Sequence, residues 1–258
     1  MSNIAVCADS LGKKYPLKKG HRELRDALVS ASLRMFAPTS AIPMAGTAPK
    51  REHWALRHAS FEIRRGEVVA LLGPNGVGKT TLLRILARIT EPTEGCAEIR
   101  GRVAPLLEVG AGFHAQLTGT ENIYVHGAIL GMKKAEIRRK FDEIVAFAGA
   151  GVKTFLGVPI KRWSRGMCVR LAFAVAAHVD ADVLLVDELL DVTDAEFRQQ
   201  CLQRIAHSAV REGRTVIFVS HDLAYARQLC TRELQFAGGQ IVKDSASAAI
   251  STREAALR

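Results

Sequence analysis

The chain has 258 residues, of which 48% are hydrophobic, and its 36 Lys and Arg outnumber its 26 Asp and Glu to give a formal net charge of +10. This composition excludes a disordered chain, and the length suffices for one large α/β domain. No apolar run reaches the roughly 18 residues of a membrane-spanning helix, and the N-terminus lacks a signal-peptide pattern. We therefore expect a protein that is cytoplasmic or is held to a membrane through a partner. Its charge fits either contact with a polyanion or a basic solvated surface.

The five cysteines are scattered and form no C-x-x-C pair. We interpret them as reduced thiols rather than as a disulfide framework or a zinc site.

The N-terminal part predicts one strand and an insert. The strand is expected at Asn3–Ala8. Lys13–Lys50 then combines basic residues, an amphipathic stretch at Arg22–Phe36 and a proline-punctuated loop. The insert could pack on its own domain, or it could contact a membrane partner or anionic head groups through its basic residues.

From Ser60 onward, short apolar strands alternate with helices. Strands are predicted at Ser60–Arg64, Val68–Leu72, Ala97–Arg100, Val103–Glu108, Val183–Val186 and Thr215–Val219, followed by a hairpin of Glu233–Phe236 and Gln240–Val242. Helices are predicted at Lys79–Ile89, Thr120–Leu130, Ala135–Phe147, Ser164–His178, Ala195–Arg211 and Leu223–Leu229, with a short helical tail at Ser245–Leu257. This alternation predicts an α/β fold with a mainly parallel central sheet.

A phosphate-binding loop is predicted between the strand Val68–Leu72 and the helix Lys79–Ile89. Gly73–Thr80 fits G-x-x-x-x-G-K-[ST], and it follows an apolar strand and precedes a helix. Backbone amides of such a loop surround phosphates, Lys79 reaches the β- and γ-phosphates, and the Thr80 hydroxyl binds Mg²⁺. A chance glycine-rich turn is the alternative. The predicted nucleotide-binding residues here are Gly73, Pro74, Asn75, Gly76, Val77, Gly78, Lys79, Thr80 and Thr81.

Two strand ends carry candidate catalytic groups. Val183–Val186 leads directly into Asp187 and Glu188. A buried carboxylate needs a partner, and we assign Asp187 to Mg²⁺. Because successive side chains of a strand point in opposite directions, we assign Glu188 to activation of the attacking water. His221 follows the next strand and could donate to the γ-phosphate. The alternatives are a surface acidic pair and a structural histidine.

These motifs, in this order, resemble those of an ABC transporter ATPase. Trp163–Met167 is similar to the signature motif of that family, with matches at Ser164 and Gly166 and with Arg165 in place of a glycine. Four segments further resemble the subfamily that exports bacterial surface polysaccharides such as O-antigen and teichoic acid: His53–Leu56, Leu107–Ile123, Trp163–Ala176 and Asp187–Asp194.

The resemblance implies a P-loop NTPase fold with an N-terminal antiparallel β subdomain and a helical signature subdomain. We expect the ATPase domain at residues 1–243, with its insert at about 13–50 and its helical subdomain at about 115–178, and a tail at 244–258. Tyr15 would stack on adenine, with Trp54 as the second candidate. Asp194 matches the aspartate of the D-loop and would contact the nucleotide. Glu108 is the nearest candidate for the missing Q-loop glutamine, and it would then contact the metal.

It also implies partners. Two chains would form a head-to-tail dimer in which each ATP lies between Lys79 of one chain and Ser164 with Gly166 of the other. Integral-membrane permease subunits would hold the dimer at the inner face of the cell membrane, and no nucleic acid is expected.

The function that the resemblance implies is ATP hydrolysis coupled to export of a lipid-linked cell-surface polysaccharide. The alternatives are another class of ABC exporter and a soluble ABC ATPase that acts on nucleic acid, which the net charge favours. We expect no C-terminal sugar-binding domain within this chain, so glycan recognition would lie elsewhere.

Overall fold

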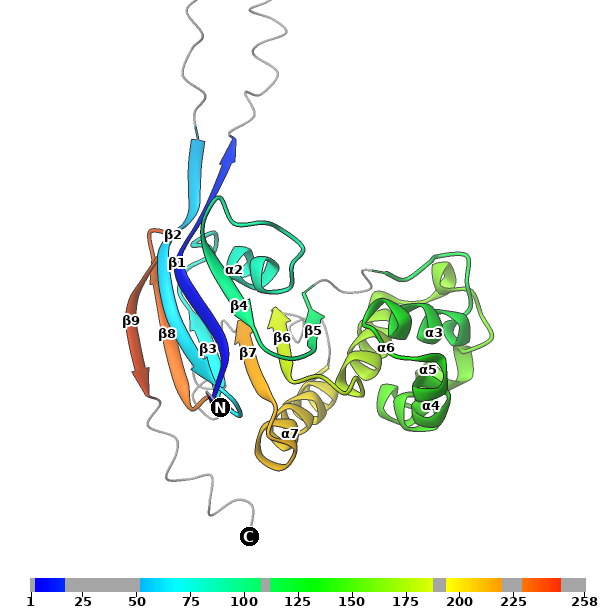
Figure 1. Ribbon diagram of the computed structural model, residues 1–258. Helices are drawn as coiled ribbons and strands as arrows, with labels where there is room; N and C mark the ends of the chain where they lie inside the picture. Colours follow the sequence, from blue (N-terminus) through cyan, green and yellow to red (C-terminus); the bar gives the residue numbers. More distant parts are fainter. Residues whose placement is uncertain (1–2, 17–51, 108–111, 188–193, 220–228, 247–258) are drawn as a thin grey trace, which may run out of the picture.

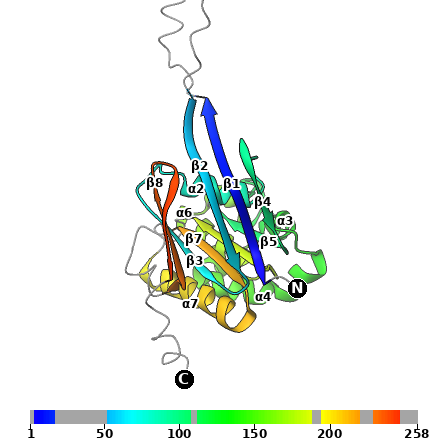
Figure 2. The same ribbon diagram turned by 60° about the vertical axis from the view of Figure 1, so that its left-hand side comes forward.

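The computed structural model describes residues 3–16, 52–107, 112–187, 194–219 and 229–246. Two β-sheets, the helices that flank them and a separate helical lobe make up the described part of the chain (Figures 1 and 2). One sheet has three strands in the order β2-β1-β4, and the other has six in the order β5-β6-β7-β3-β8-β9.

The three-stranded sheet is antiparallel and consists of β1 (Ile4–Pro16), β2 (Glu52–Arg64) and β4 (Glu94–Ile99). Along β2, buried Ala59, Phe61 and Ile63 alternate with exposed residues, so one face of the sheet covers the core.

The first two strands are longer than predicted. β1 continues through Pro16, which pairs with Glu52 at the start of β2. The alternation of apolar and polar residues is lost near Gly12 and the lysines that follow. Hydrogen bonds to β2 extend the strand through this stretch, and the local sequence does not predict that pairing. Lys13–Pro16 therefore belong to β1 and not to the predicted insert.

The six-stranded sheet forms the centre of the fold. β5 (Val103–Leu106), β6 (Val183–Asp187), β7 (Thr215–Val219), β3 (Val68–Leu72) and β8 (Arg232–Ala237) run parallel, and β9 (Gln240–Ala246) joins β8 antiparallel at one edge. β3, β6 and β7 are buried along their whole length. The mainly parallel sheet and the closing hairpin are as predicted. Ser245 and Ala246 extend β9, so the predicted helical tail does not begin at Ser245.

Helices flank this sheet. α2 (Lys79–Leu86) and α7 (Ala195–Glu212) follow strands β3 and β6. α3 (Gly119–Ile129), α4 (Lys134–Ala148), α5 (Ala150–Phe155) and α6 (Arg165–Ala177) form a helical lobe to one side of the sheets (Figure 1). None of the described helices combines the length and apolar character that crossing a bilayer requires.

Two helical predictions need correction. α2 ends at Leu86, three residues before the predicted Ile89, because Arg88 adopts a left-handed φ of 58° and the next two amides turn back to the Arg84 carbonyl. α5 was not predicted, since six residues bounded by glycines carry too little periodicity. The helix predicted at Leu223–Leu229 lies almost wholly outside the described residues.

Candidate functional site

The predicted phosphate loop connects the end of β3 to the start of α2 and is wedged between two strands. Gly73 and Gly78 both have positive φ, 144° and 108°. A Cβ atom on Gly73 would lie 2.6 Å from the Phe236 carbonyl oxygen of β8, and one on Gly78 would lie 2.1 Å from the Ala55 carbonyl oxygen of β2. Both positions therefore require glycine because neighbouring backbone occupies the space of a side chain.

Lys79, the first residue of α2, is only 4% exposed. Its Nζ donates to the carbonyl oxygens of Gly73 and Pro74, at 2.6 and 2.9 Å. The loop thus curls around an ammonium group, which is the arrangement that lets phosphate oxygens replace carbonyls as acceptors.

Beside Lys79 lies a hollow of about 260 Å³. Its lining consists of Asn75, Gly76, Gly78, Lys79, Thr80 and Thr81, which are six of the nine predicted loop residues. Gly73 and Pro74 contribute the carbonyls that hold Lys79, and Val77 is buried in the core, 8% exposed. Backbone amides, an ammonium and hydroxyl groups form a donor set suited to a polyphosphate.

The first predicted carboxylate lies at the same edge of the sheet. Asp187 ends β6 and is 7% exposed. It pairs with Val219 of β7, which pairs on its other side with Leu71 of β3. Asp187 therefore lies two strands, about 10 Å, across from the residues that lead into the phosphate loop. Glu188, His221 and Glu108 lie outside the described residues.

These groups fit a magnesium ion. The half-buried Thr80 lines the hollow at the start of α2. α2 contacts β6, and Asp187 is the last residue of that strand. Hydroxyl and carboxylate oxygens are ligands that Mg²⁺ accepts, and nucleotide-bound Mg²⁺ needs only one or two from the protein. No group of three His, Cys, Asp or Glu side chains gathers within the described part of the chain.

The predicted signature residues are at the start of α6. Ser164 caps this helix, and its Oγ accepts a hydrogen bond from the Met167 amide at 3.2 Å. Ser164 is exposed, and a side chain on Gly166 would meet only the Ser164 Oγ, at 3.9 Å. The C-terminal end of α6 leads towards β6, whereas Ser164 lies at the other end, in the helical lobe (Figure 1).

Asp194 caps α7. One of its carboxylate oxygens accepts from the Phe197 amide at 3.0 Å, and the other accepts from the Arg170 guanidinium of α6. The Phe197 amide first, and then Arg170, hold the pKa of Asp194 below its usual value. Both oxygens of Asp194 thus have partners within the chain, and the expected contact of this residue with the nucleotide stays a prediction.

The two candidate adenine-stacking aromatics lie on the paired strands β1 and β2. Tyr15 is half-buried, with Lys13 Nζ 5.4 Å from its ring centroid. The Trp54 ring faces two cations, Lys14 Nζ at 4.5 Å and the Arg57 guanidinium carbon at 5.2 Å. Trp54 precedes Ala55, whose carbonyl abuts the phosphate loop.

Sequence reasoning missed these cations and also missed Arg170. Lys14 meets Trp54 through the pairing of β1 with β2, and Arg170 meets Asp194 across two helices. Neither contact has a signal in the local sequence.

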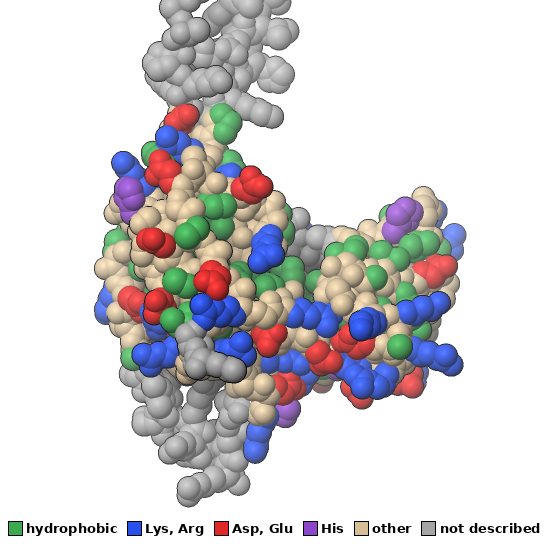
Figure 3. Space-filling model, viewed as in Figure 1, with side chains coloured by type: hydrophobic (Ala, Val, Ile, Leu, Met, Phe, Trp, Pro, Cys, Tyr) green, Lys and Arg blue, Asp and Glu red, His purple; other side chains and the backbone are tan. Residues whose placement is uncertain are grey.

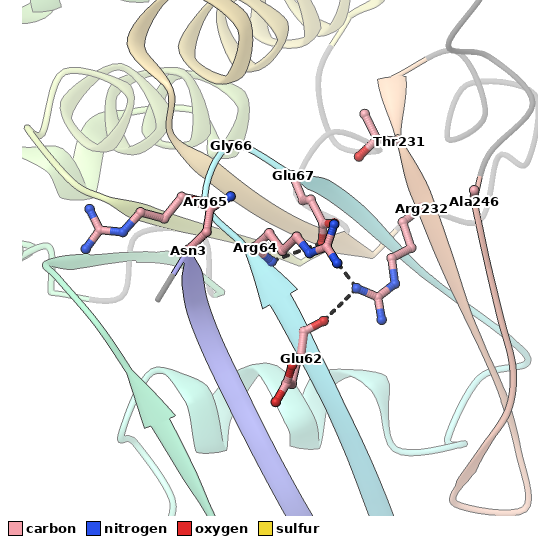
Figure 4. A pocket seen from close by; sticks show the side chains of 9 residues that line it. All are labelled: Asn3, Glu62, Arg64, Arg65, Gly66, Glu67, Thr231, Arg232 and Ala246. Carbon is pink, nitrogen blue, oxygen red and sulfur yellow. Dashed lines mark hydrogen bonds and ion pairs between the residues drawn. The ribbon is translucent and has the colours of Figure 1, made fainter. Parts of the chain in front are cut away.

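A second hollow, of about 630 Å³, lies at the opposite end of β3 (Figure 4). Three arginines line it, but Arg232 is fully engaged: Nε and Nη2 donate to the Asp244 carboxylate at 2.7 and 2.6 Å, and Nη1 donates to the Glu62 carbonyl at 2.6 Å. Arg232 therefore links the β8–β9 hairpin to β2. Because its donors are already used within the chain, this hollow is a weaker candidate for an anion site than the phosphate loop.

On the face shown in Figure 3, basic and acidic side chains of the described residues are intermixed over the sheets and the helical lobe. These described residues show no continuous basic stripe of the kind that usually accompanies binding to a nucleic-acid backbone.

Residues 56–191 match the ABC transporter family. The chain is 42% identical over 187 residues to the O-antigen export system ATP-binding protein RfbB of Myxococcus xanthus. This aligned region covers 72% of this chain and 42% of that protein. It is 40% identical over 182 residues to RfbB of Klebsiella pneumoniae, and this aligned region covers 70% of this chain and 73% of that protein. For the teichoic acids export ATP-binding protein TagH of Bacillus anthracis, identity is 39% over 189 residues, 73% of this chain and 34% of that protein. The match thus spans less than half the length of the Myxococcus and Bacillus relatives.

Two solved structures have a similar fold. The dimeric ATP-binding cassette MJ0796 bound to ADP and Pi has a TM-score of 0.71 at 21% identity, covering 93% of this chain and 98% of that one. An ATP binding subunit of an ABC transporter has a TM-score of 0.72 at 19% identity, covering 98% and 94%. At these identities the likeness concerns the fold.

Proposed function

The chain belongs to the ABC transporter family of ATPases, and we propose that it is the ATP-hydrolysing subunit of a transporter that exports a lipid-linked cell-surface polysaccharide. The observation that carries the ATPase part is the phosphate loop curled around Lys79, with Asp187 at the same edge of the sheet. The polysaccharide part is supported by the relatives, which are named for O-antigen and teichoic acid export.

ATP would lie with its phosphates in the hollow beside α2. Lys79 would exchange the carbonyls of Gly73 and Pro74 for oxygens of the β- and γ-phosphates, and the loop amides would donate to the remaining oxygens. Thr80 and Asp187 would hold Mg²⁺, which neutralises charge on the β- and γ-phosphates when it is bound. Tyr15 or Trp54 would stack on the adenine.

Three further residues complete the proposed chemistry. Glu188 follows Asp187 directly and would accept a proton from the attacking water. His221, two residues after β7, would donate to the γ-phosphate. Glu108 would take the place of the Q-loop glutamine.

We further propose that two chains assemble head to tail. The start of α6 offers amides and the exposed Ser164 hydroxyl to an anion, with Gly166 leaving the approach open, but it lies in the helical lobe and not beside the phosphate loop of the same chain. A partner chain could bring its own α6 to this ATP, so that hydrolysis depends on closure of the dimer. Integral-membrane subunits at the inner face of the cell membrane would use that closure for export.

The catalytic assignment is tested with Glu188→Gln and Lys79→Ala. Glu188→Gln should keep ATP binding and lower turnover by about 10²–10⁴-fold, the usual contribution of a general base. It should also trap an ATP-bound dimer, whereas Lys79→Ala should weaken binding itself. Turnover of Glu188→Gln at the parent rate would refute the assigned base.

The composite site is tested by adding Ser164→Arg to the Glu188→Gln chain. Size-exclusion chromatography with ATP should then show monomers, while ATP still binds each monomer with its original affinity. A dimer that forms without nucleotide and ignores Ser164 would count against the head-to-tail arrangement.

The transported substrate is tested by purifying the chain with its membrane subunits and analysing the bound lipid. A lipid-linked glycan is expected, whereas a bound protein, free lipid or drug would favour another class of exporter. The net charge of +10 favours one different function, action on nucleic acid. That alternative requires DNA or RNA binding that weakens steeply with salt.

A further inference from the structure

The start of α6 carries a cation where a helix disfavours one. Arg165 is the first residue of α6 and follows the capping Ser164 directly. The amide end of a helix bears a partial positive charge, so a basic residue there is unfavourable unless an anion lies nearby. The first turns of α3, α4 and α7 each contain a glutamate, whereas the first turn of α6 contains no acidic residue. The chain itself thus supplies no anion within this turn to offset the charge of Arg165.

The Arg165 guanidinium is available to a ligand. Its side chain is exposed, and within the described part of the chain it has no hydrogen bond or ion pair. Because the Cα–Cβ bonds of a helix tilt towards its N-terminus, a side chain at the first position leans past the helix end. Arg165 can therefore share one anion with the Ser164 hydroxyl and the amides of the first turn. Its planar fork of N–H donors matches two oxygens of a phosphoryl group.

The backbone that carries Arg165 is held in place. Trp163 is 9% exposed, and its Nε1 donates to the Val158 carbonyl at 3.0 Å. The Ser164 Oγ accepts from the Met167 amide, so its own hydrogen remains free to donate. Arg165 thus combines a fixed backbone with an unused guanidinium, and a preorganised donor of this kind is the most effective stabiliser of charge in a transition state.

We propose that Arg165 is a further catalytic residue, which each chain supplies to the ATP bound by its partner. This inference rests on the proposed head-to-tail dimer. The water oxygen bonds to the γ-phosphorus, the bond from that phosphorus to the bridging oxygen breaks, ADP leaves with the electron pair, and the water proton passes to the general base. Arg165 binds two oxygens of the transferred phosphoryl group and stabilises the charge spread over them.

Arg139 provides a matched control. It lies on α4 in the same helical lobe, and its side chain is 72% exposed. Its Nη2 lies 3.9 Å from the carboxylate of Asp180, which follows the far end of α6. The length of α6 places this pair about 20 Å from Ser164. Arg139→Ala therefore removes an equal charge from the lobe without touching the start of α6.

The first experiment measures kcat of the full-length chain at saturating ATP. Arg165→Ala should lower kcat by about 10²-fold, a usual cost of removing one preorganised donor. Arg165→Lys keeps the charge without the planar fork and should lose less. ATP affinity of the monomer should stay unchanged in both variants, because the donor belongs to the other chain. Arg139→Ala should keep the parent kcat.

Thermal unfolding separates a catalytic role from a structural one. Removing a cation from the amide end of α6 should leave the melting temperature of Arg165→Ala at or above that of the parent. Arg165→Glu places an anion there and should raise the melting temperature further, while it lowers kcat at least as much as Arg165→Ala. A lower melting temperature in both variants would make Arg165 structural and overturn the inference.

Mixing two inactive chains tests the action in trans. The Lys79→Ala chain keeps Arg165, and the Arg165→Ala chain keeps the phosphate loop, so a dimer of the two contains one complete site. The mixture should hydrolyse ATP about tenfold or more faster than either chain alone.

Three results would overturn the inference: a parent kcat in Arg165→Ala, an equal loss in Arg139→Ala, or a mixture no more active than the separate chains. The proposed function fails separately, if the parent chain itself hydrolyses no ATP.

Discussion

At the scale of single residues, His126 is an unusual buried group. It lies on α3, is 5% exposed, and neither ring nitrogen has a hydrogen-bond partner among the described residues. Phe113 meets it edge-on, with ring centroids 5.1 Å apart. Burial disfavours the charged imidazolium and lowers the pKa of His126 to about 4. The folded chain therefore carries this histidine in its neutral form at neutral pH.

This burial predicts a loss of stability in acid. Between pH 6.5, the ordinary pKa, and about 4, the unfolded chain binds a proton at His126 that the folded chain does not. The free energy of unfolding should then fall as pH drops through this window, by up to about 3 kcal/mol from this group. His126→Phe should flatten that part of the stability curve, measured by urea unfolding between pH 4 and 7. A variant with the parent slope would show that another group is responsible.

The phosphate loop allows a comparison of two glycines. A Cβ atom on Gly78 would lie 2.1 Å from the Ala55 carbonyl oxygen, whereas one on Gly76, which also has positive φ, would meet nothing within 4 Å. Gly76→Ala should therefore cost only the left-handed backbone penalty of about 1–2 kcal/mol. Gly78→Ala should lower the free energy of unfolding by more and should displace the loop from β2. Equal losses in the two variants, measured by thermal unfolding without nucleotide, would contradict the role assigned to Ala55.

Much of this loop can be predicted from sequence because its pattern is local. Strand, glycines, lysine and helix follow one another within about fifteen residues, and the strand that ends in Asp187 is apolar throughout. Contacts such as Arg170 with Asp194 or Lys14 with Trp54 join residues 24 or more positions apart. Their existence depends on strand pairing and helix packing, which a single sequence does not specify.

At the scale of elements, the start of α6 depends on α3. Trp163 precedes Ser164, and its ring lies against Gly119, where a Cβ atom would be 2.5 Å from Cζ2 and 2.6 Å from Cη2. The Trp163 Nε1 donates to the Val158 carbonyl at 3.0 Å. The glycine at the start of α3 thus makes room for the tryptophan that precedes Ser164.

A reciprocal pair of substitutions tests this dependence. Gly119→Ala should destabilise the fold by about 1–3 kcal/mol, the usual cost of overpacking. Adding Trp163→Leu shortens the clashing side chain, so the double variant should be more stable than the sum of the two single changes predicts. Denaturant unfolding of all four chains measures this difference. Strict additivity would mean that Gly119 matters for some reason other than Trp163.

Element boundaries were harder to predict than element types. β1 and β2 are longer than their local sequence patterns predict because each forms hydrogen bonds with a neighbouring strand. α2 ends earlier than predicted because Arg88 adopts a left-handed conformation, for which the sequence has no glycine as a signal. α4 agrees within one residue at each end, since its apolar positions recur with helical spacing and pack on α6.

At the scale of the whole molecule, the paired strands β1 and β2 form a ribbon that ends at residues 16 and 52 (Figure 2). Pro16 pairs with Glu52, and Tyr15 pairs with His53. Pro16 and Glu52, which flank residues 17–51 in the sequence, are therefore held side by side by the sheet, next to the aromatics of the proposed adenine site. Strand ends in this arrangement can be joined by a two-residue turn.

We therefore expect that replacing residues 17–51 with Asn-Gly leaves the ATPase core folded. The shorter loop costs less closure entropy, about 0.6 kcal/mol for each halving of its length, so the melting temperature should not fall, and ATP binding should persist. The segment carries Lys18, Lys19, Arg22 and Arg25, and each basic residue near an anionic surface contributes roughly 1 kcal/mol. Deletion should thus weaken sedimentation with vesicles that contain anionic lipid, and so should Ser at these four positions in the full-length chain. Unchanged sedimentation of both variants would rule out a lipid contact, and loss of folding on deletion would make the segment part of the core.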